Sequence, residues 1–394
     1  MCKRFTVIGI TDSREPELSS VAREAIRAGK VFSGGKRHHE IVREMLPAGH
    51  EWIDVTVPLE DVFVKYAGCE ELTVFASGDP LFYGFGGTLQ RRFPETEIEI
   101  IPAFNSLQML AHALVLPYQD MTCVSLTGRD WDNFDSALIK GLPMIGVLTD
   151  RRHTPAAIAR RMLDYGYDNY SCCVGENMGN EETQKASRMS LEEMGGKEFA
   201  MPNCVILIRS EKRDRPFGIP DAMFAHLPGR ERMITKMPIR LLSLSMLDLR
   251  NRREMWDVGF CTGSVSIEAK LQFPDLHITA FERREESREL FEINTHRFGT
   301  PDIDCVIGDF FEADLTACPH PDAVFIGGHG GRLGEMVERI SKVLRPGGVV
   351  VFNSVSDESC AAFEAAVNRC GMSVTARHRV ALDDYNPIVI LRAE

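Results

Sequence analysis

Short apolar runs recur along the whole chain, separated by turn residues and by segments with helical spacing. Residues 5–10 form the first run, and residues 18–28 then carry apolar side chains three or four positions apart. This alternation of strand and helix patterns predicts an α/β protein. Further strands in the first half are expected at 72–76, 98–101, 122–126, 144–148 and 204–208.

From Met255 to the end, the second half repeats the order strand, turn and helix. This order predicts a parallel sheet with crossover helices, the Rossmann-like arrangement. Ligands of such sheets bind beyond the carboxyl ends of the strands. Glu282, Asp309 and Gly327 each follow an apolar run, so we expect them to converge on one pocket.

The turn after the strand at 255–258 reads Asp-Val-Gly-Phe-Cys-Thr-Gly-Ser over residues 257–264. Gly259 and Gly263 leave room for a ligand close to the backbone, and Glu282 is placed to accept hydrogen bonds from ribose hydroxyls. The turn is not G-x-G-x-x-G, so the nucleoside site of an S-adenosylmethionine-dependent methyltransferase fits better than a dinucleotide site. On this motif alone, an ordinary strand–turn–helix stays an alternative.

The first half carries a glycine-rich signature of its own, Ser77-Gly78-Asp79-Pro80 followed by Leu-Phe-Tyr-Gly over residues 81–84. A sharp turn capped by an acid accounts for Asp79 and Pro80. It leaves unexplained the aromatics and glycines before a helix expected from about Gly87. We interpret that crowding as room for a ligand.

Length and composition set the organisation of the chain. At 394 residues it exceeds the usual size of one core, and residues 211–220 are charged, contain Pro and Gly and lack periodicity. We therefore predict domains at 1–210 and 223–394, joined by a linker at 211–222. The basic clusters 151–152 and 212–215 are interpreted as solvated surface or linker.

Charge and cysteine content narrow the class of protein. A net charge of −12 argues against nucleic-acid binding, and the eleven cysteines have neither zinc-finger nor C-x-x-C spacing. The apolar run at 5–10 is too short for a signal sequence or a membrane span. We expect a cytoplasmic protein that binds neither metal, membrane nor nucleic acid.

Both halves resemble families of the cobalamin pathway. The first is similar to the tetrapyrrole methylases through the signature at 77–84 and the segments Ile101–Gln108 and Val124–Arg129. The second resembles decarboxylating methyltransferases of the same pathway through residues 233–236, 257–264 and 322–331. The fusion in this order resembles the family that methylates a precorrin at carbons 5 and 15.

The resemblance implies an activity for each half. The first, a tetrapyrrole methylase-type α/β domain, would methylate carbon 5 of precorrin-6B or its cobalt form. The second, a Rossmann-like class I methyltransferase domain, would methylate carbon 15 and remove carbon dioxide from the ring C acetate, giving precorrin-8. S-adenosyl-L-methionine would be the cofactor of both halves, and a homo-oligomer is expected. Other acceptors such as RNA or a small metabolite, and a regulator without catalysis, stay alternatives; an NAD-dependent oxidoreductase lacks its fingerprint.

The residues expected at these sites follow from the motifs and the resemblance. The predicted cofactor-binding residues are Thr235, Gly259, Gly263, Ser264, Glu282, Asp309 and Phe310 in the second half, and Gly9, Asp79, Tyr83 and Ser106 in the first. The predicted catalytic residues are His329, Lys236 and Arg240, the last two as carboxylate ligands on one helix face. Asp309 as a helix-capping acid, His329 as a surface histidine and a solvated basic face are the alternatives.

Some positions depart from the family pattern. Cys261 replaces a glycine where the backbone approaches the cofactor, and Gly9-Ile10-Thr11 replaces Gly-x-Gly. Phe104-Asn105-Ser106 replaces a more usual loop of a small residue followed by two serines. His329 stands where small or hydroxyl residues are common. Since the substrate and the protein are both acidic, we also predict a local positive cleft that the net charge hides.

Overall fold

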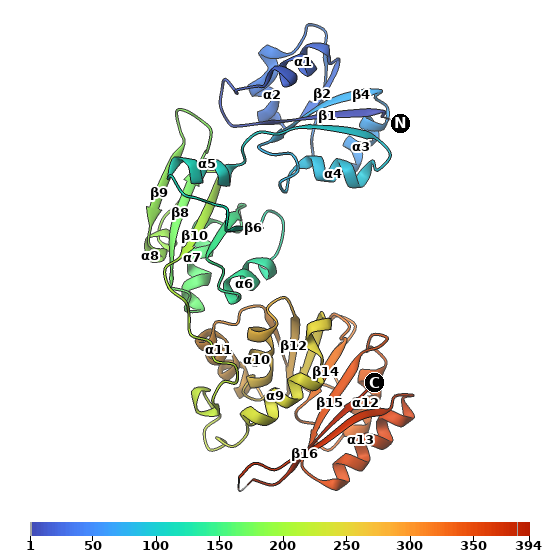
Figure 1. The fold of residues 1–394 in the computed structure, drawn as a ribbon. Coiled ribbons are helices and arrows are strands. Elements are labelled where there is room, and N and C mark those ends of the chain that lie inside the picture. The colour runs from blue at the N-terminus through green and yellow to red at the C-terminus, as the bar shows by residue number, and fades with distance from the viewer. Residues whose placement is uncertain (1, 384) are drawn as a thin grey trace. The chain divides into compact units, whose positions relative to one another are not determined.

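The computed structural model describes residues 2–383 and 385–394. Figure 1 labels the helices and strands along the chain. The contacts within the chain divide it into two compact units. Unit 1 contains residues 1–129, 143–160 and 170–210, and unit 2 contains 130–142, 161–169 and 211–394. The predicted domain limits of 1–210, 211–222 and 223–394 stay predictions, since two short segments of the first half group with unit 2.

The first sheet of unit 1 is fully parallel, with strand order β3-β2-β4-β1-β5. Its strands are β1 (Arg4–Ile10), β2 (Val31–Gly34), β3 (Glu51–Asp54), β4 (Glu71–Ser77) and β5 (Glu97–Ile101). The helices between them are α1 (Ser20–Ala28), α2 (Lys36–Val42), η1 (Arg43–Met45), α3 (Leu59–Ala67) and α4 (Phe85–Arg92). Apolar residues pack on both faces, as a parallel sheet covered by helices requires.

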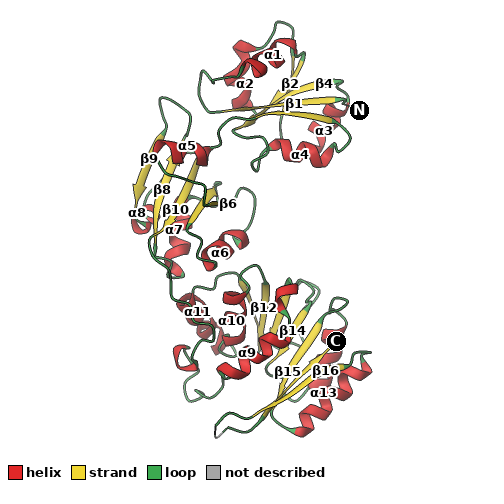
Figure 2. Cartoon of the chain, in the orientation of Figure 1, coloured by secondary structure: helices red, strands yellow, loops and turns green. Residues whose placement is uncertain are grey.

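The second sheet of unit 1 has strand order β6-β7-β10-β8-β9 and is mostly antiparallel, with only β6 and β7 parallel. Figure 2 shows strands in yellow and helices in red. Its strands are β6 (Met121–Ser125), β7 (Met144–Leu148), β8 (Tyr170–Glu176), β9 (Lys185–Met189) and β10 (Asn203–Arg209). The helices of this part of the sequence are α5 (Ser106–Ala113), α6 (Asp132–Ile139), α7 (Pro155–Asp164) and α8 (Leu191–Gly195).

Unit 2 is built on one seven-stranded sheet of order β13-β12-β11-β14-β15-β17-β16. Its strands are β11 (Glu254–Val258), β12 (His277–Glu282), β13 (Ile303–Ile307), β14 (Ala323–Ile326), β15 (Val349–Ser354), β16 (Val374–Val380) and β17 (Ile388–Ala393). Its helices after residue 211 are η2 (Asp221–Met223), α9 (Met237–Met246), η3 (Leu249–Asn251), α10 (Ser264–Gln272), α11 (Glu286–Phe298), α12 (Leu333–Ser341) and α13 (Asp357–Arg369). Strand order reverses between β11 and β14, where open α/β sheets bind their ligands.

Alternate residues of the central strands fill two cores, one on each face of this sheet. Trp256 and Val258 pack with α12 and α13, whereas Met255 packs with α9 and α10. This division explains why the strands read as continuous apolar runs. No helix among residues 2–383 and 385–394 has the length and apolar character needed to cross a membrane.

The α/β class and all strands predicted in the first half are confirmed, with limits shifted by at most a residue or two. The helix predicted at 18–28 is α1. One expectation for the second half is wrong: the sheet is not parallel to its end, because β17 pairs antiparallel with both β15 and β16. Strands β2, β3, β8 and β9 of the first half were not predicted, and neither β16 nor β17 was named as a separate strand.

The segment predicted as a linker is bound firmly to unit 2. The backbone amides of Gly218 and Ile219 donate to the two carboxylate oxygens of buried Glu268, at 3.0 and 2.9 Å. Arg213 donates to the carbonyl of Tyr165 at 3.0 Å, and Arg215 to the hydroxyl of Tyr167 at 2.6 Å. Arg213 and Arg215 are therefore part of the packing of unit 2, whereas Lys212 and Asp214 of the same cluster are exposed.

Candidate active sites

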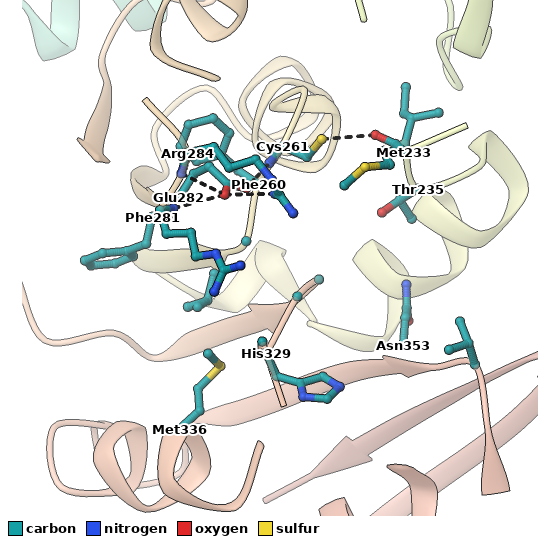
Figure 3. A pocket seen from close by; sticks show the side chains of 18 of the residues that line it. Met233, Thr235, Phe260, Cys261, Phe281, Glu282, Arg284, His329, Met336 and Asn353 are labelled. Atoms are coloured by element: carbon teal, nitrogen blue, oxygen red, sulfur yellow. Dashed lines mark hydrogen bonds and ion pairs between the residues drawn. The ribbon is translucent and has the colours of Figure 1, made fainter. Parts of the chain in front are cut away.

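A cavity of about 590 Å³ lies in unit 2 beyond the carboxyl ends of β11, β12, β13 and β14. Residues following each of these strands line it, and its walls are completed by residues 232–236 and by Asn353, Val355, Val380, Leu382, Tyr385, Asn386 and Ile388. Figure 3 shows Glu282 and Cys261 on one side of this cavity and His329 and Met336 on the other. The predicted convergence of Glu282, Asp309 and Gly327 is confirmed.

Glu282 is a buried acid in the lining of this cavity. It is only 4% exposed, yet four donors hold its carboxylate: Oε1 accepts from Arg283 N, Arg284 N and Arg284 Nη1 at 3.0–3.1 Å, and Oε2 accepts from Cys261 N at 3.1 Å. A buried carboxylate requires such partners. Oε2 has one partner and keeps a lone pair for a ligand hydroxyl.

The turn between β11 and α10 lines the cavity with Gly259, Phe260 and Cys261. Gly259 has φ +83°, and a Cβ there would lie 2.6 Å from Gly328 N. Cys261 adopts a left-handed φ of +51°, a backbone conformation that favours glycine. Its thiol points to the carbonyl oxygen of Met233 at 3.2 Å (Figure 3). Its backbone amide donates to Glu282 Oε2.

Gly263 and Ser264, both predicted to bind cofactor, do not line the cavity. Gly263 caps α10 with φ +75°, and a Cβ there would strike the ring of Phe291 at 2.5 Å. Ser264 is buried in the first turn of α10. Both residues are required by the packing of this turn, so their predicted contact with cofactor is not supported.

Asp257, at the start of the motif, stabilises the same turn through hydrogen bonds with Ser266. Its Oδ2 accepts from Ser266 N at 3.2 Å and Ser266 Oγ at 2.6 Å, and so caps the first turn of α10. Burial raises the pKa of this carboxyl to about 7, in spite of these hydrogen bonds.

Three further predicted cofactor residues line the cavity. Asp309 is exposed, and its Oδ1 accepts from Phe311 N at 2.9 Å, so it caps its own turn while facing the cavity. Phe310 is buried against the rings of Phe281 and Trp256. Thr235 lies on the wall formed by residues 232–236.

The charge of the cavity is positive although the chain is acidic. Its lining contains Arg232, Lys236, Arg283, Arg284 and Arg332, against two acids, Glu282 and Asp309. This agrees with the predicted local positive cleft. None of these arginines was predicted, although Arg283 and Arg284 directly follow the strand-end acid.

Lys236 and Arg240 do not share an exposed helix face. Lys236 precedes α9, lines the cavity, and lies 3.7 Å from Asp221 and 5.2 Å from the ring of Tyr385. Arg240 is fully buried; its Nε lies 3.3 Å from Glu268 Oε2 and its Nη1 donates to the carbonyl of Thr235 at 2.8 Å. The prediction of Arg240 as a carboxylate ligand is therefore wrong: it ties segment 219–235 to α10.

His329 lines the cavity in the glycine loop after β14. Its Nδ1 accepts from Gly331 N at 3.2 Å, and the edge of its ring meets Phe352 at a centroid distance of 5.8 Å. Partial burial lowers the pKa of His329 below its ordinary value. The hydrogen bond with Gly331 and the contact with Phe352 therefore fix the His329 side chain at the cavity wall.

Close approaches of the protein's own backbone explain two glycines of the first half, Gly9 and Gly84. A Cβ on Gly9 would lie 2.0 Å from the carbonyl oxygen of Gly78, and one on Gly84 would lie 2.6 Å from that of Pro80. The interpretation of this crowding as room for a ligand is thus not supported, because backbone fills the space. The predicted role of Gly9 in cofactor binding is not supported either, because the carbonyl of Gly78 occupies the space beside it.

Asp79, Tyr83 and Ser106 surround the meeting point of the 77–84 turn with the start of α5, where a Cβ on Gly78 would lie 2.9 Å from Asn105 Cα. Asp79 Oδ1 accepts from Leu81 N at 2.9 Å. Tyr83 is 49% exposed at φ +52°, and its hydroxyl donates to the carbonyl of Cys123 at 2.9 Å. Backbone strain of this kind in a non-glycine residue concentrates at functional sites.

A basic segment at the start of α2 also reaches this turn and was not predicted. His38 Nε2 lies 2.9 Å from Ser77 Oγ, and Arg37 donates to the same hydroxyl at 3.3 Å while pairing with Asp12 at 3.1 Å. Burial and the neighbouring guanidinium lower the pKa of His38 to about 4. The sequence Gly-Gly-Lys-Arg-His at 34–38 was the available signal. Within the described residues, no group of three or more His, Cys, Asp or Glu is arranged to hold a metal ion.

Comparison with protein families matches both halves of the chain. Residues 4–195 match the family of tetrapyrrole (corrin/porphyrin) methylases, and residues 226–390 match the precorrin methyltransferase domain. The second match contains the whole cavity lining described above, from Arg232 to Ile388.

Individual relatives span both halves or one. The decarboxylating precorrin-6Y C(5,15)-methyltransferase of Sinorhizobium sp is 32% identical over 90% of this chain and 85% of its own length. The decarboxylating cobalt-precorrin-6B C(15)-methyltransferase of Salmonella typhimurium is 40% identical over 37% of this chain and 76% of its own. A crystal structure of precorrin-6y C5,15-methyltransferase from Geobacter metallireducens GS-15 is 32% identical, covering 46% of this chain and 99% of that one with a TM-score of 0.42. The chain belongs to the family of decarboxylating precorrin-6Y C(5,15)-methyltransferases.

Proposed function

We propose that this chain methylates a precorrin at carbons 5 and 15 and decarboxylates its ring C acetate, as a bifunctional enzyme of cobalamin biosynthesis. The observation that carries the proposal is the strand-end cavity of unit 2, where a buried acid lies in a basic lining, in a chain of which 90% matches a member of this family. The methyl donor is S-adenosyl-L-methionine.

The residues of the cavity fit this donor. Glu282 Oε2 retains a lone pair for ribose hydroxyls, and Asp309 and Phe310 follow the neighbouring strand on the side proposed for adenine. Thr235 and Gly259 line the same cavity. When bound, S-adenosyl-L-methionine supplies an electrophilic methyl group.

The protein contributes position and charge to methyl transfer. In-line displacement at an electron-rich carbon needs little covalent help, so orientation of the acceptor supplies much of the rate. The basic lining suits an acceptor with several carboxylates. Lys236 and His329 are proposed to contact this acceptor.

Decarboxylation uses the acceptor's own electron sink. The bond between the acetate methylene and its carboxylate breaks, its electron pair is delocalised into the conjugated tetrapyrrole, and carbon dioxide leaves. A proton from solvent then completes the new methyl group. The chain needs only to orient the acetate and to keep it free of ion pairs, which would stabilise the starting carboxylate.

In unit 1 we propose that Asp79, Tyr83 and Ser106 lie on the cofactor side of the carbon-5 site, supported by their grouping around the 77–84 turn. A reducing, cytoplasmic location is proposed from the eleven free cysteines. The expected homo-oligomer stays a prediction that sedimentation equilibrium measures.

Mass spectrometry of the product tests the function. The full chain is incubated with precorrin-6B or its cobalt form and isotopically labelled S-adenosyl-L-methionine. Two labelled methyl groups and loss of one carbon dioxide are expected. One methyl group without decarboxylation would leave only the first activity, and an unchanged tetrapyrrole in both forms would favour another acceptor or a regulator.

A further inference from the structure

The five basic residues that line the cavity differ in their partners. Arg284 pairs with Glu282 at 3.0 Å, Arg332 with Glu335 at 2.6 Å, and Lys236 lies 3.7 Å from Asp221. Arg232 and Arg283 have no carboxylate within 4.0 Å among the described residues. A guanidinium without an acid partner in a ligand cavity is available for an anionic group of the ligand.

Arg283 lies against the glycine loop that carries His329. An ideal Cβ on Gly330 would be 3.4 Å from Arg283 Nη1, so the guanidinium reaches the residue next to the histidine. Gly330 has φ +56°, and a side chain there would crowd this approach. The end of β12 and the loop after β14 therefore bring two donor side chains to neighbouring places on the cavity wall.

The hydrogen bond at Nδ1 decides which nitrogen of His329 carries the proton. Because Nδ1 accepts from Gly331 N, the proton of the neutral ring must be on Nε2. Among the described residues Nε2 has no hydrogen-bond partner, and the ring lines the cavity. His329 thus presents an N–H donor to a ligand, rather than the base that its residue type suggested.

We propose that Arg283 and His329 together bind one carboxylate of the tetrapyrrole, and that this carboxylate is one the reaction retains. Both groups offer only donors, which matches a carboxylate. A guanidinium on the departing carboxylate would stabilise the starting state more than the transition state and slow the loss of carbon dioxide. The pair therefore orients the macrocycle through a group that does not react. This inference rests on the proposed function.

The test uses the full chain and measures four quantities: KM and kcat of the carbon-15 step, the Kd of S-adenosyl-L-methionine, and the Kd of the tetrapyrrole by absorbance titration. Arg283→Met keeps the aliphatic stem and removes the charge. We expect it to raise KM and the tetrapyrrole Kd 30- to 100-fold, with kcat and the cofactor Kd changed less than threefold, since the contact is the same in ground and transition states. Carbon-5 methylation by the same chain checks the integrity of protein and substrate.

Two comparisons separate binding from structure. His329→Phe keeps the ring beside Phe352 and should raise KM five- to tenfold, whereas His329→Gln keeps a side-chain N–H and should stay within threefold of the wild type. Arg288→Met removes an exposed arginine of α11 that pairs with Glu285 at 2.8 Å outside the cavity, and should change neither KM nor Kd.

Several outcomes would overturn the inference. In Arg283→Met these are a tetrapyrrole Kd within twofold of the wild type, an equal weakening of cofactor binding, or a raised kcat of the carbon-15 step together with the raised KM. The last would mean that Arg283 held the departing carboxylate. If the wild type transfers no methyl group to any precorrin, the proposed function fails, while the tetrapyrrole Kd of the variants still decides whether this pair binds a carboxylate.

Discussion

In unit 2, four parallel strands of one sheet end side by side, and the residues that follow them line one cavity. In unit 1, the predicted residues come from the ends of β1 and β4 in one sheet and from α5, which leads to a second sheet. Within one parallel sheet, strand direction alone places the following residues at one edge. Residues from two sheets meet only as the folded loops dictate, which is why the predictions were sharper for unit 2.

The two regions are alike in their glycines. Gly9, Gly84, Gly259 and Gly263 all stand where a Cβ would strike the protein's own backbone or an aromatic ring. A glycine motif therefore reports a close internal approach in both units. What distinguishes unit 2 is the buried acid with four donors and the basic lining around it.

The largest effect is expected from Gly9→Ala, which places a Cβ 2.0 Å from Gly78 O and 2.7 Å from Ala103 N. Neither backbone atom can move away without distorting the fold, so we expect the free energy of unfolding measured in urea to fall by at least about 3 kcal/mol. Gly87→Ala in α4, with only the end of Arg91 at 3.8 Å, is the control and should change stability by less than about 1 kcal/mol. A stable Gly9→Ala variant that has lost carbon-5 methylation would instead assign the space to a ligand.

Next in size is Glu282→Gln, which disturbs four hydrogen bonds to a buried carboxylate. We expect carbon-15 methylation to fall at least about 100-fold, equivalent to about 3 kcal/mol, because charge-assisted bonds are lost and donors are left unpaired. Asp79→Asn, which affects one bond to Leu81 N, should lower carbon-5 methylation less than about tenfold. Labelled methyl incorporation at each carbon measures both, and equal losses would remove the difference between the regions.

A pH-dependent effect is expected at Asp257, whose pKa is raised by burial from 3.8 to about 7. Between these values the folded chain holds a proton that the unfolded chain releases, so this group's stabilisation is present at low pH and lost as pH rises through 7. The wild type should therefore lose about 2–3 kcal/mol between pH 5 and 8 relative to Asp257→Asn. Urea unfolding of both proteins at the two pH values checks this, and parallel curves would show that the carboxyl titrates normally.

The smallest effect concerns Cys261, which holds a left-handed φ of +51°. Cys261→Gly should stabilise the chain by about 1 kcal/mol through relief of that strain, less the weak bond of its thiol to Met233 O. Calorimetry should also find the cofactor Kd within threefold of the wild type, because the amide that binds Glu282 is kept. A tenfold gain in cofactor affinity would instead mean that the thiol obstructs the site.

Much of the fold was predictable because a strand that is buried on both faces of its sheet has a continuous run of apolar residues. β7 was predicted with its observed limits, Met144–Leu148. Strands β2 and β3 were missed because each has only four residues, with polar residues at or near their ends. The direction of β16 and β17 was missed because apolar runs do not record strand polarity.

The site divides in a similar way. Glu282, Asp309 and Gly327 were predictable as residues following parallel strands, whereas Arg240 was misassigned since a charged residue at helical spacing gives no sign of its buried acid, 28 positions away in the sequence. Gly263 and Ser264 belong to a motif that contacts the cavity only in part.

The sequence by itself determined the α/β class, the family of each half and the edge of the sheet where the second site forms, because these depend on periodicity and on the order of motifs. Only the tertiary structure decided which basic residues of the cavity lack an acidic partner, and that Arg240 pairs with Glu268. It also decided which nitrogen of His329 bears the proton. Those facts depend on contacts between residues far apart in the chain, and burial and pairing set the charge that each side chain can offer a ligand.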